Sequence, residues 1–466
     1  MQLTLLVLPL DIEKILKTFK QIGQLTESSN PTSMKKFVRN KSKVGIRLLS
    51  VRSAEQNNVH LLPSMICRFR ERKGMDEVLN MKIDEMAGCE FDCSCGRHHS
   101  FSLHDMIIKS GAINELPKVA ADFKDEDILV VFDNNTYEVA GKRALEILRD
   151  AGFKHVREML FDTGNDILIP SSATVGRILF GINKDTKLVI GVGSGVINDS
   201  IKYVTSRAHI PYIIVATAPS MDGYVSDGCP VLFDGLKISL VGDLTYAVIG
   251  DTEILKTAPD DLIQAGFGDV VGKITALVDW DLAVKANGDY RCDTCVKLVQ
   301  SALDKCFAKV EGLPKRDEAA LGALMEALTL TGVTMALVGI SRPASGSEHI
   351  LSHFWEMDYV ARGVNPIHHG VTVGVATPVV CRMFEELADE LPEGVMDWMV
   401  PSDEVKALLA KAGSPVTPKD AGISKDLFHK SVLEAYKIRD RYSILRFAVE
   451  KGYINDLADK LTDEIY

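Results

Sequence analysis

Histidines in the C-terminal half of the chain, together with one upstream aspartate, have side chains that bind divalent metals. His349 and His353 lie four positions apart, so on a helix they share one face. His369 opens a later apolar segment, and Asp269 lies in Gly266-Phe-Gly-Asp. One carboxylate and two imidazoles from three helices would leave a position open for a substrate oxygen. Each of these side chains could instead cap a helix or hydrogen-bond within the core.

A glycine-rich turn near residue 193 indicates a site for a nucleotide phosphate. An apolar run reaches glycines at 191, 193 and 195, and a helix-like segment over 196–208 follows. Glycines let backbone N–H groups approach a ligand, and the start of a helix favours negative charge. The spacing is Gly-x-Gly-x-Gly, not the Gly-x-Gly-x-x-Gly of the dinucleotide fingerprint. Glycines that only make a tight turn therefore remain the alternative.

A second group of thiols and imidazoles lies between residues 89 and 104. Its members are Cys89, Cys93, Cys95, His98, His99 and His104. Cys-x-Cys is not the usual spacing of a zinc knuckle, so a structural role in a hairpin or adventitious metal binding is favoured over catalysis. Cys292 and Cys295 form a Cys-x-x-Cys on a helical segment, which lacks the βαβ context of a redox motif and is interpreted as packing.

Short apolar runs alternate with helical periodicity from about residue 81 to residue 255. Strands are expected over 127–132, 156–161, 188–191 and 212–217, with helices between them. This alternation predicts an α/β class: a Rossmann-like parallel-sheet domain over 81–255. Ligands of such sheets bind beyond the carboxyl ends of the strands, where Asp133, Gly193 and Ser220 fall.

The chain past residue 255 reads as helices throughout. It predicts an all-helical domain over 256–466, with the active site in the cleft between the two domains. Residues 321–338 are apolar almost all round, which is typical of a buried central helix.

Composition excludes several classes of protein and partner. A net charge of −11 over 466 residues makes nucleic acid an improbable partner. No apolar run is expected to span a bilayer, and nine unevenly spaced cysteines do not form a secreted disulfide framework, so a cytoplasmic location is expected. Basic residues outnumber acidic ones over 1–74. Residues 1–80 are interpreted as an extension outside the folded unit and are assigned no function.

Three separated motifs resemble the sn-glycerol-1-phosphate dehydrogenase family. They are Thr217-Ala-Pro-Ser-Met-Asp-Gly, Gly266-Phe-Gly-Asp with Lys273, and Arg342-Pro-Ala-Ser-Gly-Ser-Glu-His. The superfamily includes glycerol dehydrogenase, iron-dependent alcohol dehydrogenases and dehydroquinate synthase. The resemblance covers roughly residues 85–466, including the tail motif Arg439-Asp-Arg-Tyr. It implies a dehydroquinate synthase-like fold.

The resemblance implies positions for a metal, a nicotinamide cofactor and a substrate. The metal ligands would be Asp269, His349 and His369. Asp222 would bind substrate, His353 would stand beside it, and Lys273 would join them as a catalytic residue. NAD or NADP would contact Asp133, Gly193, Ser194, Gly195, Val196, Ile197, Thr217, Ala218, Pro219, Ser220 and Ser226.

Two departures from the superfamily pattern bear on the metal. Iron-dependent alcohol dehydrogenases carry a fourth histidine ligand four residues after the aspartate, where this chain has Lys273. This difference favours zinc or nickel over iron. The family usually has glutamate two residues after the last histidine ligand, where this chain has Val371, and His368 remains an alternative ligand. Lys273 and Arg342 are candidates for binding a substrate phosphate.

The resemblance implies reversible reduction of dihydroxyacetone phosphate to sn-glycerol 1-phosphate, a step toward the glycerophosphate backbone of phospholipids. His353, or a water that it orients, would deliver the proton. A homo-oligomer is expected. The alternatives are a glycerol or other polyol dehydrogenase, a lyase like dehydroquinate synthase that returns the hydride, and a non-catalytic member that serves assembly.

Overall fold

A computed structural model describes residues 75–164, 166–233 and 236–466, which all lie in one compact unit of the chain. The described part begins with helix α3 (Met75–Asn80), whose Val78 is fully buried. Residues 75–80 of the segment that is interpreted above as an extension therefore form a helix with a buried side chain. Residues 1–74 of that segment lie outside the described residues.

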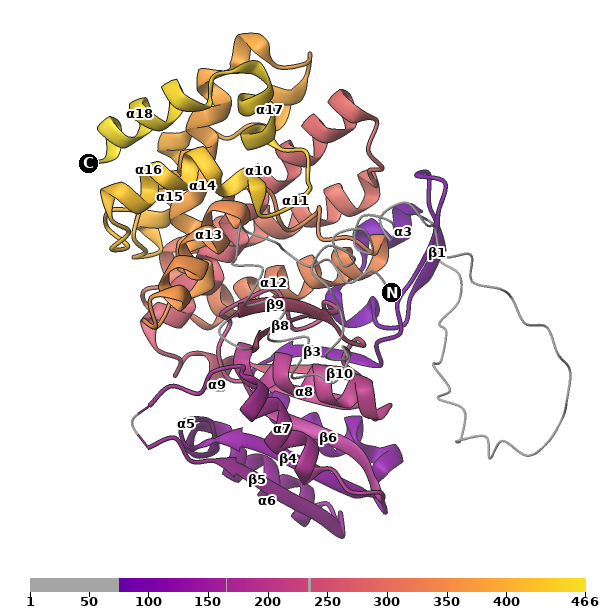
Figure 1. Cartoon of the computed structure of the whole chain (residues 1–466). Helices are drawn as coiled ribbons and strands as arrows, with labels where there is room; N and C mark the ends of the chain where they lie inside the picture. The colour runs from indigo at the N-terminus through magenta and orange to yellow at the C-terminus, as the bar shows by residue number, and fades with distance from the viewer. Residues whose placement is uncertain (1–74, 165, 234–235) are drawn as a thin grey trace, which may run out of the picture. The chain divides into compact units, whose positions relative to one another are not determined.

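A six-stranded sheet forms the first part of the fold (Figure 1). Its strands lie side by side in the order β3-β10-β7-β6-β4-β5, and all neighbours are parallel. The strands are β3 (Asp105–Lys109), β4 (Asp127–Asp133), β5 (His155–Phe161), β6 (Thr186–Gly193), β7 (Tyr212–Ala216) and β10 (Ala247–Asp251). The predicted α/β class with a parallel sheet is confirmed.

The chain reverses direction across the sheet between β4 and β6. After β4 it adds β5 on one side, then returns past β4 to place β6 on the other. Such a switch point opens a crevice at the carboxyl ends of its two strands, where α/β proteins bind ligands. Strands β3 and β10 are not predicted from the sequence. Because a hairpin and not a helix precedes β10, strand–helix alternation does not reveal that strand.

Alternating side chains of β4 enter two different cores, because successive residues of a strand point to opposite faces. Ile128 and Val130 pack with helix α6 (Lys142–Asp150), whereas Leu129 and Val131 belong to the core that contains α8 (Gly195–Ala208). Helices therefore cover both faces, which explains the near-continuous apolar strands. The remaining helical elements of this part are η1 (Ile83–Glu85), η2 (Ala112–Glu115), α4 (Leu116–Val119), η3 (Ala121–Phe123), α5 (Asn134–Thr136), η4 (Tyr137–Gly141) and α7 (Ser172–Gly181).

Two antiparallel hairpins lie outside the main sheet. The first pairs β1 (Glu90–Asp92) with β2 (His98–Ser100), and the second pairs β8 (Gly228–Phe233) with β9 (Leu236–Val241). The first hairpin carries the cysteine- and histidine-rich stretch, so its loop and strands fix the positions of those side chains.

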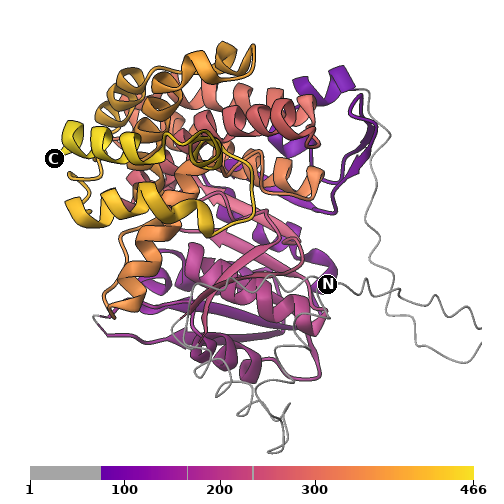
Figure 2. The same ribbon diagram turned by 45° about the horizontal axis from the view of Figure 1, so that its top comes forward.

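Helices make up the rest of the described chain, and in both views residues 260–466, coloured red to yellow, form one contiguous group (Figures 1 and 2). They are α9 (Thr252–Leu255), α10 (Asp260–Asn287), α11 (Asp293–Phe307), α12 (Glu318–Val338), α13 (Ser347–Ala361), α14 (His369–Glu386), α15 (Ser402–Lys411), α16 (Lys425–Glu434), α17 (Ile444–Lys451) and α18 (Ile454–Ile465). Short helical turns connect them: η5 (Val310–Gly312), η6 (Ala388–Glu390), η7 (Val395–Trp398) and η8 (Ala435–Lys437).

Helix α12 is the buried central helix that the sequence predicts. It is long and apolar enough to cross a membrane, contrary to the expectation that no segment is. However, 72% of its most apolar window is buried inside the protein, so core packing accounts for its composition. Helices α10 and α14 pack closely because glycines line their contact: a Cβ atom on Gly268 would lie 2.2 Å from the carbonyl oxygen of Gly370.

Candidate active site

The three candidate metal ligands converge from three helices. Asp269 lies in α10, His349 in the first turn of α13, and His369 is the first residue of α14. Their ligand atoms all lie within 4.8 Å of one another, and His349 Nε2 is 3.5 Å from Asp269 Oδ1. Asp269 and His349 are buried, and His369 is partly exposed. The close packing of α10 against α14 makes this meeting possible.

Two glutamates orient the imidazoles of this cluster. Glu348 Oε1 lies 2.8 Å from His349 Nδ1, and Glu356 Oε1 lies 2.5 Å from His369 Nδ1. When Nδ1–H is donated to a carboxylate, Nε2 remains as the ligand atom, as is usual for metal-binding histidines. Sequence reasoning missed both glutamates. A signal exists, because Glu348 adjoins His349 and Glu356 lies one helical turn past His353.

Lys273 bridges two carboxylates of the site. Its Nζ lies 2.6 Å from Asp269 Oδ1 and 2.7 Å from Asp222 Oδ2, and the Asp222 backbone N–H donates to Asp269 Oδ2 at 3.0 Å. Burial disfavours both charges, yet the ion pairs prevail: the pKa of Lys273 is raised, and that of Asp269 is lowered by Lys273 and His349. Asp269 is therefore ionised, which is the form that ligates a metal. An ionised carboxylate with two oriented imidazoles fits a divalent cation.

His353 stands beside the cluster and contacts an arginine from the chain's tail. Its ring centroid is 5.2 Å from that of His369, and Arg439 Nη2 lies 3.1 Å from His353 Nδ1. Because a guanidinium can only donate, Nδ1 accepts, and neutral His353 carries its proton on Nε2. Arg439 Nη1 also donates to Ser345 Oγ at 3.2 Å. Sequence reasoning placed Arg439 in a tail motif but assigned it no role.

The candidate cofactor residues meet at the carboxyl ends of β4, β6 and β7. Gly193 ends β6, Ser194 precedes α8, and residues 195–197 form its first turn. Residues 217–220 directly follow β7, and the Thr217 N–H donates to the Gly193 carbonyl at 3.1 Å. A Cβ on Gly193 would lie 2.7 Å from Ile197 Cβ, which explains the glycine.

The start of α8 fits a phosphate. Among the described residues no side chain caps it, so its first amides can donate to an anion. Asp133 ends β4 beside β6, and its Oδ1 accepts from the Thr136 N–H at 2.8 Å. Ser226 is buried, and its hydroxyl lies 3.4 Å from the Gly223 carbonyl.

The loop after β7 connects the cofactor residues to the metal cluster. Helix α10 packs directly on this loop, because a Cβ on Gly266 would lie 1.6 Å from the carbonyl oxygen of Pro219. Three residues later, Asp222 contacts both Lys273 and Asp269. The glycine turn, the loop after β7 and the three metal ligands therefore form one contiguous site.

Two alternatives from the sequence analysis have other partners. Arg342 donates to Asp289 Oδ2 at 2.7 Å and to the Tyr442 carbonyl at 2.6 Å, so its donors hold structural contacts. His368 is exposed and pairs with Asp261 Oδ2 at 3.0 Å. His369, and not His368, belongs to the group of ligand atoms.

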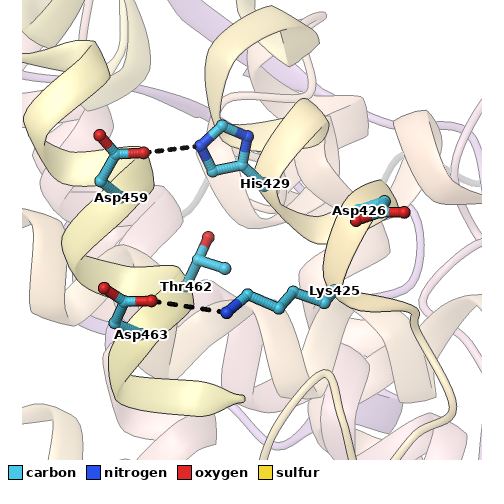
Figure 3. Close-up of a pocket in the computed structure, with 6 residues that line it drawn as sticks. All are labelled: Lys425, Asp426, His429, Asp459, Thr462 and Asp463. Atoms are coloured by element: carbon cyan, nitrogen blue, oxygen red, sulfur yellow. Dashed lines mark hydrogen bonds and ion pairs between the residues drawn. The ribbon is translucent and has the colours of Figure 1, made fainter.

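An open cavity of about 500 Å³ lies between α16 and α18 (Figure 3). His429 reaches Asp459 at 2.9 Å and Lys425 reaches Asp463 at 3.5 Å across it, with Thr462 between the two pairs. None of its lining residues belongs to the candidate site. These exposed ion pairs connect two helices and contribute little stability.

Comparisons with known proteins show which proteins this chain is similar to. Residues 107–259 match the iron-containing alcohol dehydrogenase family. The glycerol-1-phosphate dehydrogenase [NAD(P)+] of Halalkalibacterium halodurans is 30% identical over 376 residues, covering 76% of this chain and 94% of the relative. The enzyme of the same name from Methanosarcina mazei is 31% identical over 347 residues. This match covers 73% of this chain and 90% of the relative.

Solved structures confirm the predicted fold. Glycerol dehydrogenase from Schizosaccharomyces pombe superposes with a TM-score of 0.58 at 17% identity, covering 78% of this chain and 92% of that one. Maleylacetate reductase from Rhizobium sp. strain MTP-10005 superposes with a TM-score of 0.59 at 16% identity. The match covers 78% of this chain and 97% of that one. At these identities the likeness concerns the fold alone.

Proposed function

Because this chain belongs to the glycerol-1-phosphate dehydrogenase family, within the iron-containing alcohol dehydrogenases, we propose that it reversibly reduces dihydroxyacetone phosphate to sn-glycerol 1-phosphate. The reductant would be NADH or NADPH. The observation that carries this proposal is that the glycine turn after β6, the loop after β7 and the Asp269–His349–His369 cluster are contiguous. A hydride donor held at the turn would thus lie beside a substrate held at the cluster.

The cofactor pyrophosphate would bind the first turn of α8. The amides that follow Gly193 and Ser194 would donate to its oxygens, and the positive end of the helix would favour its charge. The residues of the loop after β7, Thr217, Ala218, Pro219 and Ser220, would line the nicotinamide side, with Ser226 nearby. Asp133, at the end of the neighbouring strand β4, would contact the adenosine end.

Asp269, His349 and His369 would hold one divalent metal, zinc or nickel. Once bound, it would polarise the substrate carbonyl as a Lewis acid. Protonated Lys273 has no lone pair and cannot ligate. It instead forms ion pairs with Asp269 and Asp222, which keep Asp269 ionised and Asp222 beside it. The chain would therefore supply three metal ligands and leave one coordination position for a substrate oxygen.

His353 and Arg439 would handle the proton and the substrate phosphate. Arg439 donates to Nδ1 of His353, so Nε2 carries a proton that would hydrogen-bond the reduced oxygen and orient the water that protonates it. Arg439 is only partly buried as a residue, and its guanidinium beside this imidazole carries donors suited to phosphate. Asp222 would accept a hydrogen bond from the substrate hydroxyl.

A spectrophotometric assay tests the proposal. Purified protein is incubated with dihydroxyacetone phosphate and NADH or NADPH, with added Zn²⁺ or Ni²⁺ or with chelator. We expect metal-dependent oxidation of the reduced nicotinamide with this substrate and little with unphosphorylated dihydroxyacetone. Preference for the unphosphorylated ketone would identify a polyol dehydrogenase instead. Turnover of a substrate without net change in the nicotinamide would identify a lyase.

A further inference from the structure

A second group of metal-binding side chains forms around the hairpin β1–β2. Cys93 and Cys95 lie in its loop, His99 lies on β2, and Cys292 directly precedes helix α11. The three sulfurs and one imidazole nitrogen all lie within 4.8 Å of one another. This group shares no residue with the candidate active site. It contains only part of the stretch that the sequence analysis noted.

The distances within the group are those of ligands around one small ion. His99 Nε2 is 3.2 Å from Cys95 Sγ and 3.4 Å from Cys292 Sγ, and Cys93 Sγ is 3.6 Å from Cys292 Sγ. A tetrahedral zinc with bonds of about 2.3 Å to sulfur and about 2.0 Å to nitrogen places S···S at about 3.8 Å and S···N at about 3.5 Å. The side chains therefore need to move little to bind zinc.

Neighbouring groups already orient these four ligands. His99 Nδ1 lies 2.7 Å from the carbonyl oxygen of Leu337 at the end of α12, so Nδ1 donates and Nε2 faces the sulfurs. Hydroxyl groups hydrogen-bond two of the sulfurs: Thr294 Oγ1 lies 3.2 Å from Cys93 Sγ, and Tyr290 Oη lies 3.2 Å from Cys95 Sγ. Outer hydrogen bonds of this kind fix ligands in metal sites.

We propose that Cys93, Cys95, His99 and Cys292 bind a structural zinc ion, separate from the metal of the active site. Four protein ligands close the coordination sphere and leave no position for a substrate. The ion would fasten the β1–β2 hairpin to the start of α11 and the end of α12, which are remote in sequence. Arg97, stacked on the Tyr290 ring at 3.4 Å, attaches the hairpin loop to the same segment.

The nearest competing explanation is that the thiols only hydrogen-bond or form a disulfide. A disulfide needs sulfurs about 2.0 Å apart, shorter than the 3.6 Å between Cys93 and Cys292. Hydrogen bonding alone gives no reason for three sulfurs to surround one imidazole nitrogen. Cys89 and Cys295 are buried nearby but lie outside the group of ligand atoms, and the Cys295 thiol hydrogen-bonds Cys292 from beside the group.

Metal content and spectroscopy of the full-length protein test the site. Protein purified under reducing conditions and dialysed against zinc should contain about two zinc ions per chain, one for each site. Cobalt replacement should give a sulfur-to-cobalt charge-transfer band, because an Asp–His–His site has no sulfur to produce one. A spectrum without that band would overturn the proposal, and it requires no variant that might fail to fold.

Variants assign the band to these residues. Cys95→Ser should lower zinc to about one ion per chain and abolish the charge-transfer band. Cys306→Ser, a matched change of a buried cysteine in α11, should retain both ions. His349→Ala should lose one ion and keep the band, which separates this site from the active site. Retention of two ions and the band by Cys95→Ser, or disulfide formation shown by a reduced thiol count, would refute it.

Discussion

Lys273 is a fully buried cation whose partners, Asp222 and Asp269, both belong to the proposed active site. In metal-free protein, Lys273→Met should lower the free energy of unfolding by about 3–5 kcal/mol, because it removes the buried cation that pairs with the buried carboxylate of Asp269 and the partly buried carboxylate of Asp222. With metal bound the loss should be smaller, since the ion offsets the charge of Asp269. Urea denaturation with and without EDTA measures both values.

Lys202 provides the matched control for this substitution. It is also fully buried, and its Nζ donates to the carbonyls of Gly223 and Gly228 at 2.6 and 3.0 Å and lies 3.6 Å from Asp199 Oδ1, so none of its partners is a candidate metal ligand. Lys202→Met should therefore lower the free energy of unfolding by the same amount with and without metal. If the Lys273 variant behaves in the same way, its ion pair is not coupled to a metal site.

Glu356 should set the metal affinity of His369 through the hydrogen bond to Nδ1. We expect Glu356→Gln to weaken metal binding about 10–100-fold, with activity recovered at higher metal concentration. Competition with a chelator measures the affinity. Asp261→Asn, which removes the comparable partner of His368, should leave the affinity unchanged. The reverse result would make His368 the ligand.

At the scale of elements, the contact of α10 with the loop after β7 leaves no space for a side chain at Gly266. Gly266→Ala should lower the free energy of unfolding by about 1–3 kcal/mol and reduce nicotinamide binding, because its Cβ would overlap the Pro219 carbonyl. Calorimetry and cofactor titration measure these effects. Gly322→Ala in α12 meets only Thr252 Cγ2 at 3.7 Å, so it should be neutral or stabilising. Equal effects of both changes would contradict the close contact.

Arg157 joins three strands by bonding Asp127 on β4 at 2.7 Å and Thr186 on β6 at 2.8 Å from its own position on β5. This hydrogen bond lowers the pKa of Asp127 below its usual 3.8. A carboxyl with a lowered folded-state pKa adds stability above its unfolded pKa and loses it as pH falls.

Asp127→Asn should therefore lower the free energy of unfolding by about 1 kcal/mol near pH 7 and by the same amount near pH 5. Below about pH 4 the difference from the unsubstituted protein should become progressively smaller. Denaturant titrations across this range measure the difference. Asp125→Asn removes an exposed partner of Lys154 and should have no effect at any pH. A cost of Asp127→Asn that does not change down to about pH 3 would exclude the ionised carboxylate as its cause.

At the scale of the whole molecule, the chain's tail returns to the active site and delivers Arg439 to His353. Arg439→Gln keeps an amide donor but removes the charge. It should raise KM for dihydroxyacetone phosphate about 10–100-fold, since a charge-assisted hydrogen bond contributes about 1.5–3 kcal/mol. The KM for NADH and the metal content should stay unchanged. Steady-state kinetics with each substrate varied measure this split.

Arg342→Gln is the control for the substrate phosphate. Its guanidinium holds Asp289 and the Tyr442 carbonyl, so the change should lower thermal stability and leave KM unaltered. If instead Arg342→Gln raises KM and Arg439→Gln does not, the phosphate binds where the sequence analysis placed it.

Local patterns alone predicted much of the molecule. Alternating apolar runs and helical periodicity fix the parallel sheet and the helices after it, because both signals depend on neighbouring residues. Residue chemistry likewise identified Asp269 and a group of histidines as candidates. The family resemblance selected Asp269, His349 and His369, and the packing of three helices brings them together. Strands β3 and β10 were not predicted, because they lie outside the regular alternation of strand and helix on which the prediction depends.

Only the tertiary structure decided which of several similar side chains meet. His368 and His369 are neighbours at the start of α14, yet only His369 joins the cluster, whereas His368 pairs with Asp261. Cys292 was interpreted as packing, but it lies beside His99, 193 positions away in the sequence. Side-chain chemistry and periodicity are properties of short segments, so the sequence determined the ligand types and the elements. Partners distant in the chain depend on how helices and hairpins pack, which no local pattern records.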